Sequence, residues 1–428
     1  MQIRFIIVIL MAINVLINYA DRANVSVLIM EIKKEFSYLQ NEWNQSLVFG
    51  SFYVGYILSQ VLSGFLSDKF GGKYVLAFGC FLWSTSEVIF PYGASKLKIF
   101  IILRVCLGLG EGLVFPAIHS ILSKILPPKE KAPSAAIILS FGHMGTILSL
   151  LVTSKFIGCW RCVFVGCGIV GFVWLVPWIV FSASSPETSI WMSNDEKSVI
   201  GCNAKSAQSE NKRAKKLNLL QIFSSKAMWA IIIANYCSGY LFYLQLNFLP
   251  IYLHERYGYK SEVAAKLVII PYLMLLLLSL VLGKINSRIS SKNKKKWMQI
   301  IGMIAGIVCV TITIFIPDKY KHLSIIFHFT AASTYAFGMY GSHVSHFDLS
   351  PGSAGLLYAI GNTFTNIAGL SSVLISGMLL RMGYEWNWVF GVAVCHLVFG
   401  VLVWGTFSSS KPDVEEKDDS GIKVPGEL

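Results

Sequence analysis

The chain has 428 residues, of which 54% are hydrophobic and only 14% are charged. A soluble domain carries roughly a quarter charged residues, and the mean hydropathy here is +0.61, so the composition excludes an ordinary soluble protein. The net charge of +13 would suit a nucleic-acid binder, but Lys and Arg gather in short breaks between apolar runs, where they orient membrane helices. We therefore expect a protein of the lipid bilayer, with no nucleic acid as partner.

Apolar runs long enough to cross a bilayer, about 20 residues each, follow one another along almost the whole chain. They predict twelve transmembrane helices at residues 4–29, 44–66, 73–92, 97–124, 133–155, 161–183, 226–249, 262–287, 297–316, 321–344, 351–379 and 386–407. The predicted fold class is therefore an all-α membrane protein with two pseudo-symmetric six-helix bundles.

The predicted helices divide the chain into four parts. An amino-terminal six-helix bundle is expected over 1–183, and a carboxy-terminal six-helix bundle over 226–407. Between them, residues 184–225 are polar and contain a basic run, which predicts a water-exposed linker. The tail 408–428 is acidic and lacks aromatic residues, so we expect it to be disordered.

Positive charges distinguish the two sides of the membrane. Lys and Arg concentrate in alternate breaks, at Arg4, Lys69 and Lys73, 124–131, 197–226 and 288–296. Cytosolic loops carry such an excess, so we expect both termini and the linker to lie in the cytosol. The pattern does not choose between the plasma membrane and the membrane of an acidic organelle.

Nine cysteines lie mostly inside apolar runs. We interpret all nine as small hydrophobic residues, including Cys159 and Cys162 in the sequence CWRC, because no second pair lies at the spacing of metal ligands. No metal and no cofactor are expected. A membrane-embedded enzyme would need a cluster of carboxylates or metal ligands, and the sequence offers none, so we expect no enzymatic activity.

A short repeat marks the cytosolic side of both predicted halves. The chain reads GFLSDKFGGK at 64–73, after the second helix, and GKINSR at 283–288, after the eighth. Duplicated halves flanking a midplane site are typical of secondary transporters. GFLSDKFGGK resembles the signature loop of the major facilitator superfamily. Its glycines permit a tight turn, Asp68 can cap a neighbouring helix and the lysines anchor at headgroups, so we expect a gating role for Asp68, Lys69, Gly71, Gly72 and Lys73.

Further segments resemble the anion:cation symporter family, which contains sodium-phosphate, sialic acid and vesicular glutamate transporters. They are NYADRANVSV (18–27), GSFYVGYILSQ (50–60), RVCLGLGEGLVFPAIHSILSKILPP (104–128), CWRCVFVGCG (159–168), SPETSIWMSNDEKSVI (185–200), NYCSGYLFYLQLNFLPIYL (235–253) and HFDLSPGSAGLLYAIGNTFTNIAG (346–369). The resemblance implies a cavity lined by the first, fourth, seventh and tenth helices, transport by alternating access and, we expect, a monomer.

Few ionisable side chains lie inside the predicted helices, where they are costly unless they face a partner or water. At ~1.5 Å per residue, Arg22 and Arg104 lie roughly 8–10 Å above the middle of their helices, with Glu111 near the midplane. Arg104 and Glu111 are seven residues apart and share one helix face. The resemblance implies an arginine at the positions of Arg22 and Arg104 and a glutamate at that of Glu111.

These three residues form the expected transport site. Guanidinium groups bind carboxylate and phosphate in a fork geometry, so we expect Arg22 and Arg104 to bind a small anionic solute. We expect Glu111 to couple transport to protons, because its protonation would release Arg104 for the anion. A purely structural ion pair between Arg104 and Glu111 is the alternative. Asp21 is expected to steady a neighbouring helix, and Glu87 to face the headgroups.

Other residues take their expected roles from the resemblance. Tyr53, Tyr56, Tyr240 and Asn362 match positions near the family's cavity and are expected to contact substrate, and His119 is expected to take part in gating. At two positions the chain differs from the family, and these differences restrict the expected class of substrate. Ser238 stands where the family commonly has His or Arg, and Phe49 stands where vesicular glutamate transporters have His. Glutamate with vesicular-type regulation is therefore disfavoured, and a monoanion or a less charged solute is favoured, with phosphate still open.

The sequence thus predicts a secondary active transporter of a small organic or inorganic anion, coupled to protons. Two alternatives stay open: a sodium-coupled phosphate transporter, and a non-transporting receptor or anion channel on the same scaffold. The driving force is expected to be a proton or sodium gradient.

Overall fold

The computed structural model describes residues 2–198, 200, 219–288, 293–349 and 354–408, and within them the chain is helical. In the first half of the chain the helices are α1 (Ile3–Glu35), α2 (Glu42–Phe70), α3 (Gly72–Gly93), α4 (Leu97–Gly112), α5 (Val114–Ile125), α6 (Pro128–Lys155) and α7 (Trp160–Phe181). In the second half they are α9 (Leu219–Ser224), α10 (Lys226–Tyr257), α11 (Ser261–Leu267), α12 (Ile269–Arg288), α13 (Lys294–Phe315), α14 (Lys321–Ser333), α15 (Tyr335–Tyr340), α16 (Ser342–Leu349), α17 (Ala354–Arg381) and α18 (Trp386–Phe407).

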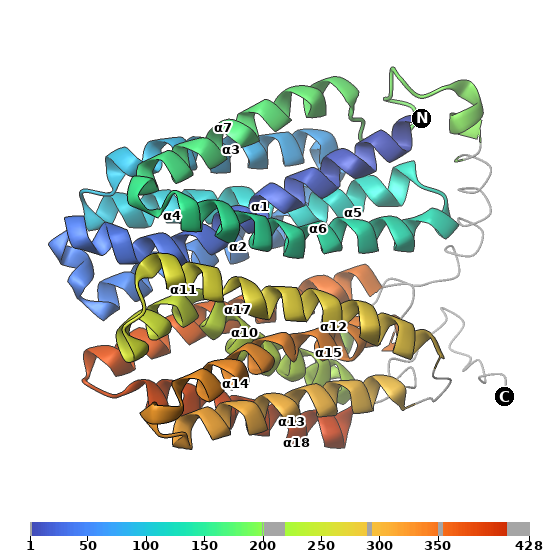
Figure 1. The fold of residues 1–428 in the computed structure, drawn as a ribbon. Helices are drawn as coiled ribbons and strands as arrows, with labels where there is room; N and C mark the ends of the chain where they lie inside the picture. Colours follow the sequence, from blue (N-terminus) through green and yellow to red (C-terminus); the bar gives the residue numbers. More distant parts are fainter. Residues whose placement is uncertain (1, 199, 201–218, 289–292, 350–353, 409–428) are drawn as a thin grey trace.

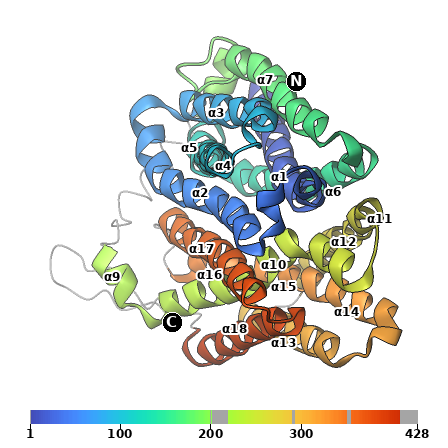
Figure 2. The ribbon, with the colours of Figure 1, turned by 90° about the vertical axis from the view of Figure 1, so that its left-hand side faces the viewer.

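The helices gather into two groups. Figures 1 and 2 show α1 to α7 packed together on one side and α10 to α18 on the other. The two groups meet where α2 packs against α17 and where α1 packs against α10. Much of the predicted linker and the predicted disordered tail lie outside the described residues.

The described residues contain ten helices long and apolar enough to span a membrane, or eleven when the bent α2 counts as one. The remaining predicted span, 321–344, is divided among α14, α15 and α16. Apolar side chains cover the outer surface: Phe78, Val173 and Leu277, for example, are each more than half exposed. A lipid environment suits such a surface, so the chain is a multi-pass membrane protein.

Two further predicted helices contain a break that the apolar pattern did not indicate. The span 97–124 is divided at Leu113 between α4 and α5, and the span 262–287 at Val268 between α11 and α12. In each case a proline, Pro116 or Pro271, is the third residue of the following helix. Proline has no N–H to donate to the carbonyl four residues earlier, so each helix is interrupted just after that unpaired carbonyl.

Other helices are longer than predicted. α1 continues six residues beyond 29, to Glu35, and α10 continues from 249 to Tyr257. Gly258 ends α10 with φ of 70°, a left-handed conformation that glycine adopts readily. Because α1 is longer at its end than expected, Arg22 lies only about 5 Å from the middle of its helix rather than 8 Å.

The interpretation of all nine cysteines as unpaired was wrong. Cys159 and Cys162 form a disulfide, called the CWRC disulfide below. The short helical turn Ile157–Cys159 leads directly into α7 and leaves the two Cα atoms 5.4 Å apart, within the range that a disulfide spans. Among the described cysteines the other six are free.

Candidate functional site

An ion pair between Arg22 on α1 and Glu111 on α4 lies inside the helices of the first half. The distance from Arg22 Nε to Glu111 Oε2 is 2.6 Å, and the two side chains are 6% and 0% exposed. Three aromatic rings surround the guanidinium, with centroids 5.0 Å (Tyr19), 5.0 Å (Phe52) and 4.5 Å (Tyr56) from its Cζ atom. The pair is therefore held in an aromatic enclosure, where its charges are screened little by water.

Arg104 of α4 is the second buried arginine of this centre. Its Cζ atom is 5.0 Å from the Phe52 ring, and its Nε donates a long hydrogen bond of 3.5 Å to the carbonyl of Val48. Both arginines thus contact the same ring, which places their Cζ atoms within about 10 Å of each other. Arg104 is buried and its Nη1 has no hydrogen-bond partner, so this cation retains an unused donor.

The prediction that Glu111 interacts with Arg104 was wrong. Glu111 pairs with Arg22 from another helix and makes no ion pair with Arg104 in its own. The spacing of seven residues puts Arg104 and Glu111 on one face but also about 10 Å apart along the axis. Arg22 lies near the middle of the full α1, at the level of Glu111, which allows the pairing across helices.

Glycine makes this arrangement possible. A Cβ atom at Gly108 of α4 would lie 2.1 Å from the carbonyl oxygen of Phe52 and 2.9 Å from the amide nitrogen of Tyr56, both on α2. Reciprocally, a Cβ atom at Gly55 of α2 would lie 2.1 Å from the carbonyl oxygen of Val105. The two backbones are in contact, so the aromatic side chains of α2 reach both arginines on α1 and α4.

The expected substrate residues of α2 contact the second half of the chain. Asn247 of α10 donates a hydrogen bond of 3.0 Å to the hydroxyl of Tyr53, and the rings of Tyr53 and Tyr243 lie 5.2 Å apart. Asn366 of α17 accepts a hydrogen bond of 3.4 Å from Tyr243. Asn247 and Asn366 were missed as individual site residues, because their place beside Tyr53 depends on how the two halves pack.

The other expected substrate residues lie elsewhere. Tyr240 stacks on His396 within the second half, with centroids 4.1 Å apart. Asn362 is half-buried, and its backbone carbonyl accepts a hydrogen bond from the side chain of Asn366 one turn later. Neither contacts the two arginines in this structure.

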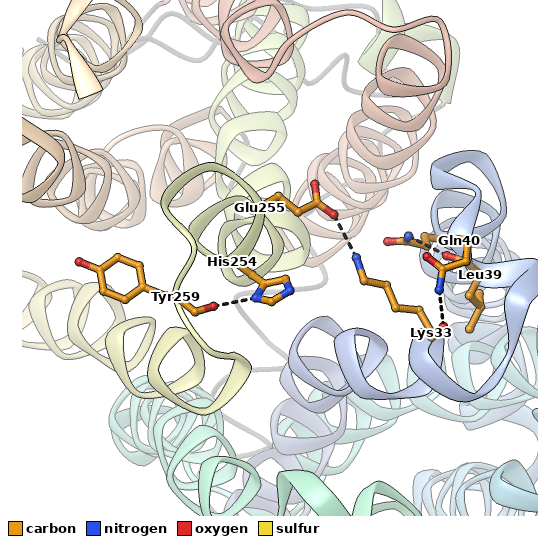
Figure 3. Close-up of polar contacts among 7 residues, drawn as sticks. Lys33, Leu39, Gln40, His254, Glu255 and Tyr259 are labelled. Carbon is orange, nitrogen blue, oxygen red and sulfur yellow. Dashed lines mark hydrogen bonds and ion pairs between the residues drawn. The ribbon is translucent and has the colours of Figure 1, made fainter. Parts of the chain in front are cut away.

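An ion pair joins the two halves at the end formed by residues 33–45 and 254–260, here called the η1 end after the short helix η1 (Ser37–Gln40). Figure 3 shows Lys33 of α1 facing Glu255 of α10, with Nζ 3.0 Å from Oε1. Next to it, Gln40 donates to the backbone of Lys33, and His254 bonds with the carbonyl of Tyr259. Further in, Phe49 of α2 packs on Phe248 of α10.

The opposite end carries the expected gating residues. Gly71, with φ of 86°, joins α2 to α3, and a Cβ atom there would lie 2.5 Å from Ser184 Oγ. Lys73 donates from its backbone to Ser184 Oγ and from Nζ to the carbonyls of Ile179 and Ser182. The loop is thereby tied to the end of α7.

The other two expected gating residues at this end, Asp68 and His119, differ in their contacts. Asp68 is exposed and makes no hydrogen bond with the described residues, and α3 begins after Gly71 without a side-chain cap. The expectation that Asp68 caps the next helix was therefore wrong. His119 of α5 is exposed, and its ring lies 5.8 Å from that of Tyr358 on α17. His119 therefore approaches the second half at this end.

Glu87 was wrongly expected to face the headgroups. Its side chain is fully buried, and neither carboxylate oxygen has a hydrogen-bond partner. Asp21 is in the same situation on α1. The register of α3 turns Glu87 toward the interior of the first half, where Gly168 of α7 approaches Ser84 and Val88 closely.

These observations define a class: an all-helical, multi-pass membrane protein whose two halves enclose a buried charged centre. A sequence model of the Major Facilitator Superfamily matches residues 11–371. The chain belongs to the Major Facilitator Superfamily, as the sequence predicted.

Relatives and solved structures agree with this assignment. The chain is 29% identical to the chloroplastic ascorbate transporter of Arabidopsis thaliana, over 95% of this chain and 75% of that protein. It is 30% identical to sialin of Ovis aries, over 86% and 76% respectively. The structure of a D-xylose-proton symporter matches with a TM-score of 0.75 and 17% identity, over 95% of this chain and 99% of that one. These relatives confirm the resemblance to anion transporters, and the solved structure confirms the fold.

Proposed function

We propose that the protein is a secondary active transporter of a small anion, driven by a proton gradient and working by alternating access. Relatives are named as carriers of ascorbate, of phosphate and of glutamate, which favours an anion as substrate. The observation that carries the proposal is the buried pair of Arg22 and Glu111 beside a second buried arginine, Arg104.

The proposed coupling follows from competition for Arg22. While Glu111 is ionised, it occupies the guanidinium of Arg22. Protonation of Glu111 removes that competitor, and the anion then binds Arg22 together with the free donor of Arg104. A carboxylate or phosphate group is suited to this exchange, because it offers the same oxygen acceptors as Glu111.

A monoanion is the favoured substrate. Ser238 accepts a hydrogen bond of 2.9 Å from Gln299, which also bonds with Ser342, so a neutral polar network occupies the place of the family's cation. Phe49 packs against Phe248. The positive charge for the substrate therefore comes from the two arginines of the first half alone, without a third cation from the second half.

Alternating access would open the η1 end and close the opposite end in turn. In the described state, Tyr53, Asn247, Lys33 and Glu255 join the halves toward the η1 end. Opening this end requires those contacts to break, while the loop at Gly71 and His119 would come closer to the second half. The bound anion would be exposed first to one side and then to the other.

For topology we propose that the η1 end faces away from the cytosol and that both termini face it. Of the basic breaks, Lys69 and Lys73 lie at the opposite end beside Gly71. The CWRC disulfide lies at the η1 end, because Arg161 between its two cysteines bonds with Glu35, and an oxidising compartment would maintain it there. The proposed location is the plasma membrane or an acidic organelle, and a monomer is the proposed transporting unit.

The test is uptake by purified protein in liposomes, with a panel of labelled anions and with pH and sodium gradients imposed separately. Saturable uptake that follows the pH gradient is expected, and Arg22→Ala and Arg104→Ala should abolish it, whereas Glu262→Gln on the surface should not. Wild-type uptake in either arginine variant would reject the binding assignment. Uptake that follows sodium at constant pH would favour the second candidate, since one relative is named as a sodium-dependent phosphate transport protein.

A further inference from the structure

Two buried carboxyl groups lie outside the pair described above. Asp21 of α1 and Glu87 of α3 are each 0% exposed, and none of their four carboxylate oxygens accepts a hydrogen bond from a nitrogen or a hydroxyl group, although the thiol of Cys167 lies beside Asp21. An ionised carboxylate without a partner is costly to bury, and a proton removes that cost. Neither carboxyl group has a role in the transport cycle proposed above.

Three helices bring the two carboxyl groups to one place. Asn24, one turn after Asp21, donates a hydrogen bond of 3.2 Å to the sulfur of Cys167 on α7. The next residue, Gly168, lies so close to α3 that a Cβ atom there would be 2.7 Å from the Val88 side chain and 3.1 Å from the Val88 amide nitrogen. Asp21 and Glu87 therefore flank the same turn of α7, inside the group of helices that Figure 2 shows around α1, α3 and α7.

A row of polar side chains on α1 leads to this place. Asn14, Asn18 and Asp21 follow one another at spacings of four and three residues, so they share one face of the helix over about 10 Å. Both amides are buried, and none of their nitrogen and oxygen atoms has a hydrogen-bond partner; the indole nitrogen of Trp83, one turn before Glu87, is also unpaired. Buried polar atoms of this kind are usually satisfied by internal water.

The charges in this interior do not balance. Away from the helix ends, the buried Lys, Arg, Asp and Glu side chains among the described residues of the first half are two arginines, Arg22 and Arg104, and three carboxyl groups, Asp21, Glu87 and Glu111. Charges in a medium of low dielectric are stable chiefly as pairs. The empty carrier therefore reaches neutrality when one of the three carboxyl groups is protonated, and Glu111 is already engaged by Arg22.

We propose that Asp21 and Glu87 form a second proton-binding site between α1, α3 and α7, which holds one proton in the carrier without substrate. This inference rests on the proposed function for its role in transport: the site keeps Glu111 ionised and paired with Arg22 until the anion arrives. The charged and titratable groups that surround the site are Arg22, Arg104, Glu111, Cys80 and Cys167.

A proton suits the site better than a metal ion. The described residues include no group of three or more His, Cys, Asp and Glu side chains placed to hold a metal. Two carboxyl groups that share one proton leave a single negative charge, which the nearby Arg104 can balance. Sodium at the same place is an outcome that the test distinguishes.

The test is infrared difference spectroscopy of the purified protein, which detects the carbonyl band of a protonated buried carboxyl group and needs no transport. The wild type is expected to show this band at neutral pH. Either Glu87→Gln or Asp21→Asn should remove it, because two carboxylates then balance two arginines without a proton. Glu262→Gln, at an exposed surface pair with Lys266, should leave it unchanged. If one interior variant fails to fold, the other decides.

Three results would overturn the proposal: no band in the wild type, a band that persists in a folded interior variant, or a band that sodium chloride abolishes at constant pH. A lack of any anion transport in the wild type would reject the proposed function and not the proton site, because the carbonyl band is measured without transport.

Discussion

The closest test of the buried ion pair is a double-mutant cycle on Arg22 and Glu111. The side chains make a hydrogen bond of 2.6 Å and are 6% and 0% exposed. Two unit charges 4 Å apart attract each other by about 4 kcal/mol at an effective dielectric constant of about 20. The rings of Tyr19, Phe52 and Tyr56 offset part of the loss when Glu111 is neutralised, because each cation–π contact contributes about 0.5–2 kcal/mol. We therefore expect a coupling free energy of about 3 kcal/mol.

The cycle compares Arg22→Met, Glu111→Gln and the double variant with the wild type, by denaturant titration of the purified protein under identical lipid or detergent conditions. A matched control cycle combines Arg104→Met, in place of Arg22→Met, with Glu111→Gln. Arg104 contacts the same Phe52 ring but makes no ion pair with Glu111. This control should give a smaller coupling, of about 1.7 kcal/mol at most, because two unit charges about 10 Å apart attract each other by that amount at the same effective dielectric constant. Effects of Arg22→Met and Glu111→Gln that add within about 0.5 kcal/mol, or a larger coupling in the Arg104 cycle, would refute the reasoning.

Three further predictions concern the scaffold around the site. Gly108→Ala should lower the yield of folded protein and reduce transport several-fold, because its Cβ atom would meet the backbone of α2 at 2.1 Å, whereas Gly64→Ala, which meets nothing within 4 Å, should be silent; equal expression and uptake of the two variants would contradict the close packing. Lys33→Glu should make the η1 end more accessible to a thiol reagent at an introduced cysteine, and the added change Glu255→Lys should restore protection, since the pair joins the two halves; a double variant as open as the single one would argue against the contact. Alkylation with and without reductant, read by mass spectrometry, should reveal the CWRC disulfide as two thiols that react after reduction alone.

The sequence was sufficient to predict the helices and the superfamily, because both depend on local patterns. Apolar runs define spans regardless of their neighbours, and GFLSDKFGGK depends on a turn that Gly71 makes with φ of 86°. Breaks inside spans were harder to predict, since Pro116 and Pro271 interrupt runs that are apolar throughout.

The site could be predicted only in part. The depth of Arg22, Arg104 and Glu111 follows from residue counting, but which arginine meets Glu111 depends on how α1 and α4 are rotated and on the length of α1. The same limit explains the error at Glu87, because hydropathy does not say which face of a helix turns inward. Contacts such as Asn247 with Tyr53 depend on packing between the halves, for which a single sequence carries little signal.

The central claim is that Glu111 couples protons to anion transport by competing for Arg22. The most direct measurement compares two activities of Glu111→Gln in liposomes: exchange of labelled for unlabelled anion, and accumulation of the anion driven by a pH gradient. The account predicts that exchange continues while accumulation is lost, because the neutral amide leaves Arg22 available to the anion and carries no proton. Accumulation at the level of the wild type would contradict it.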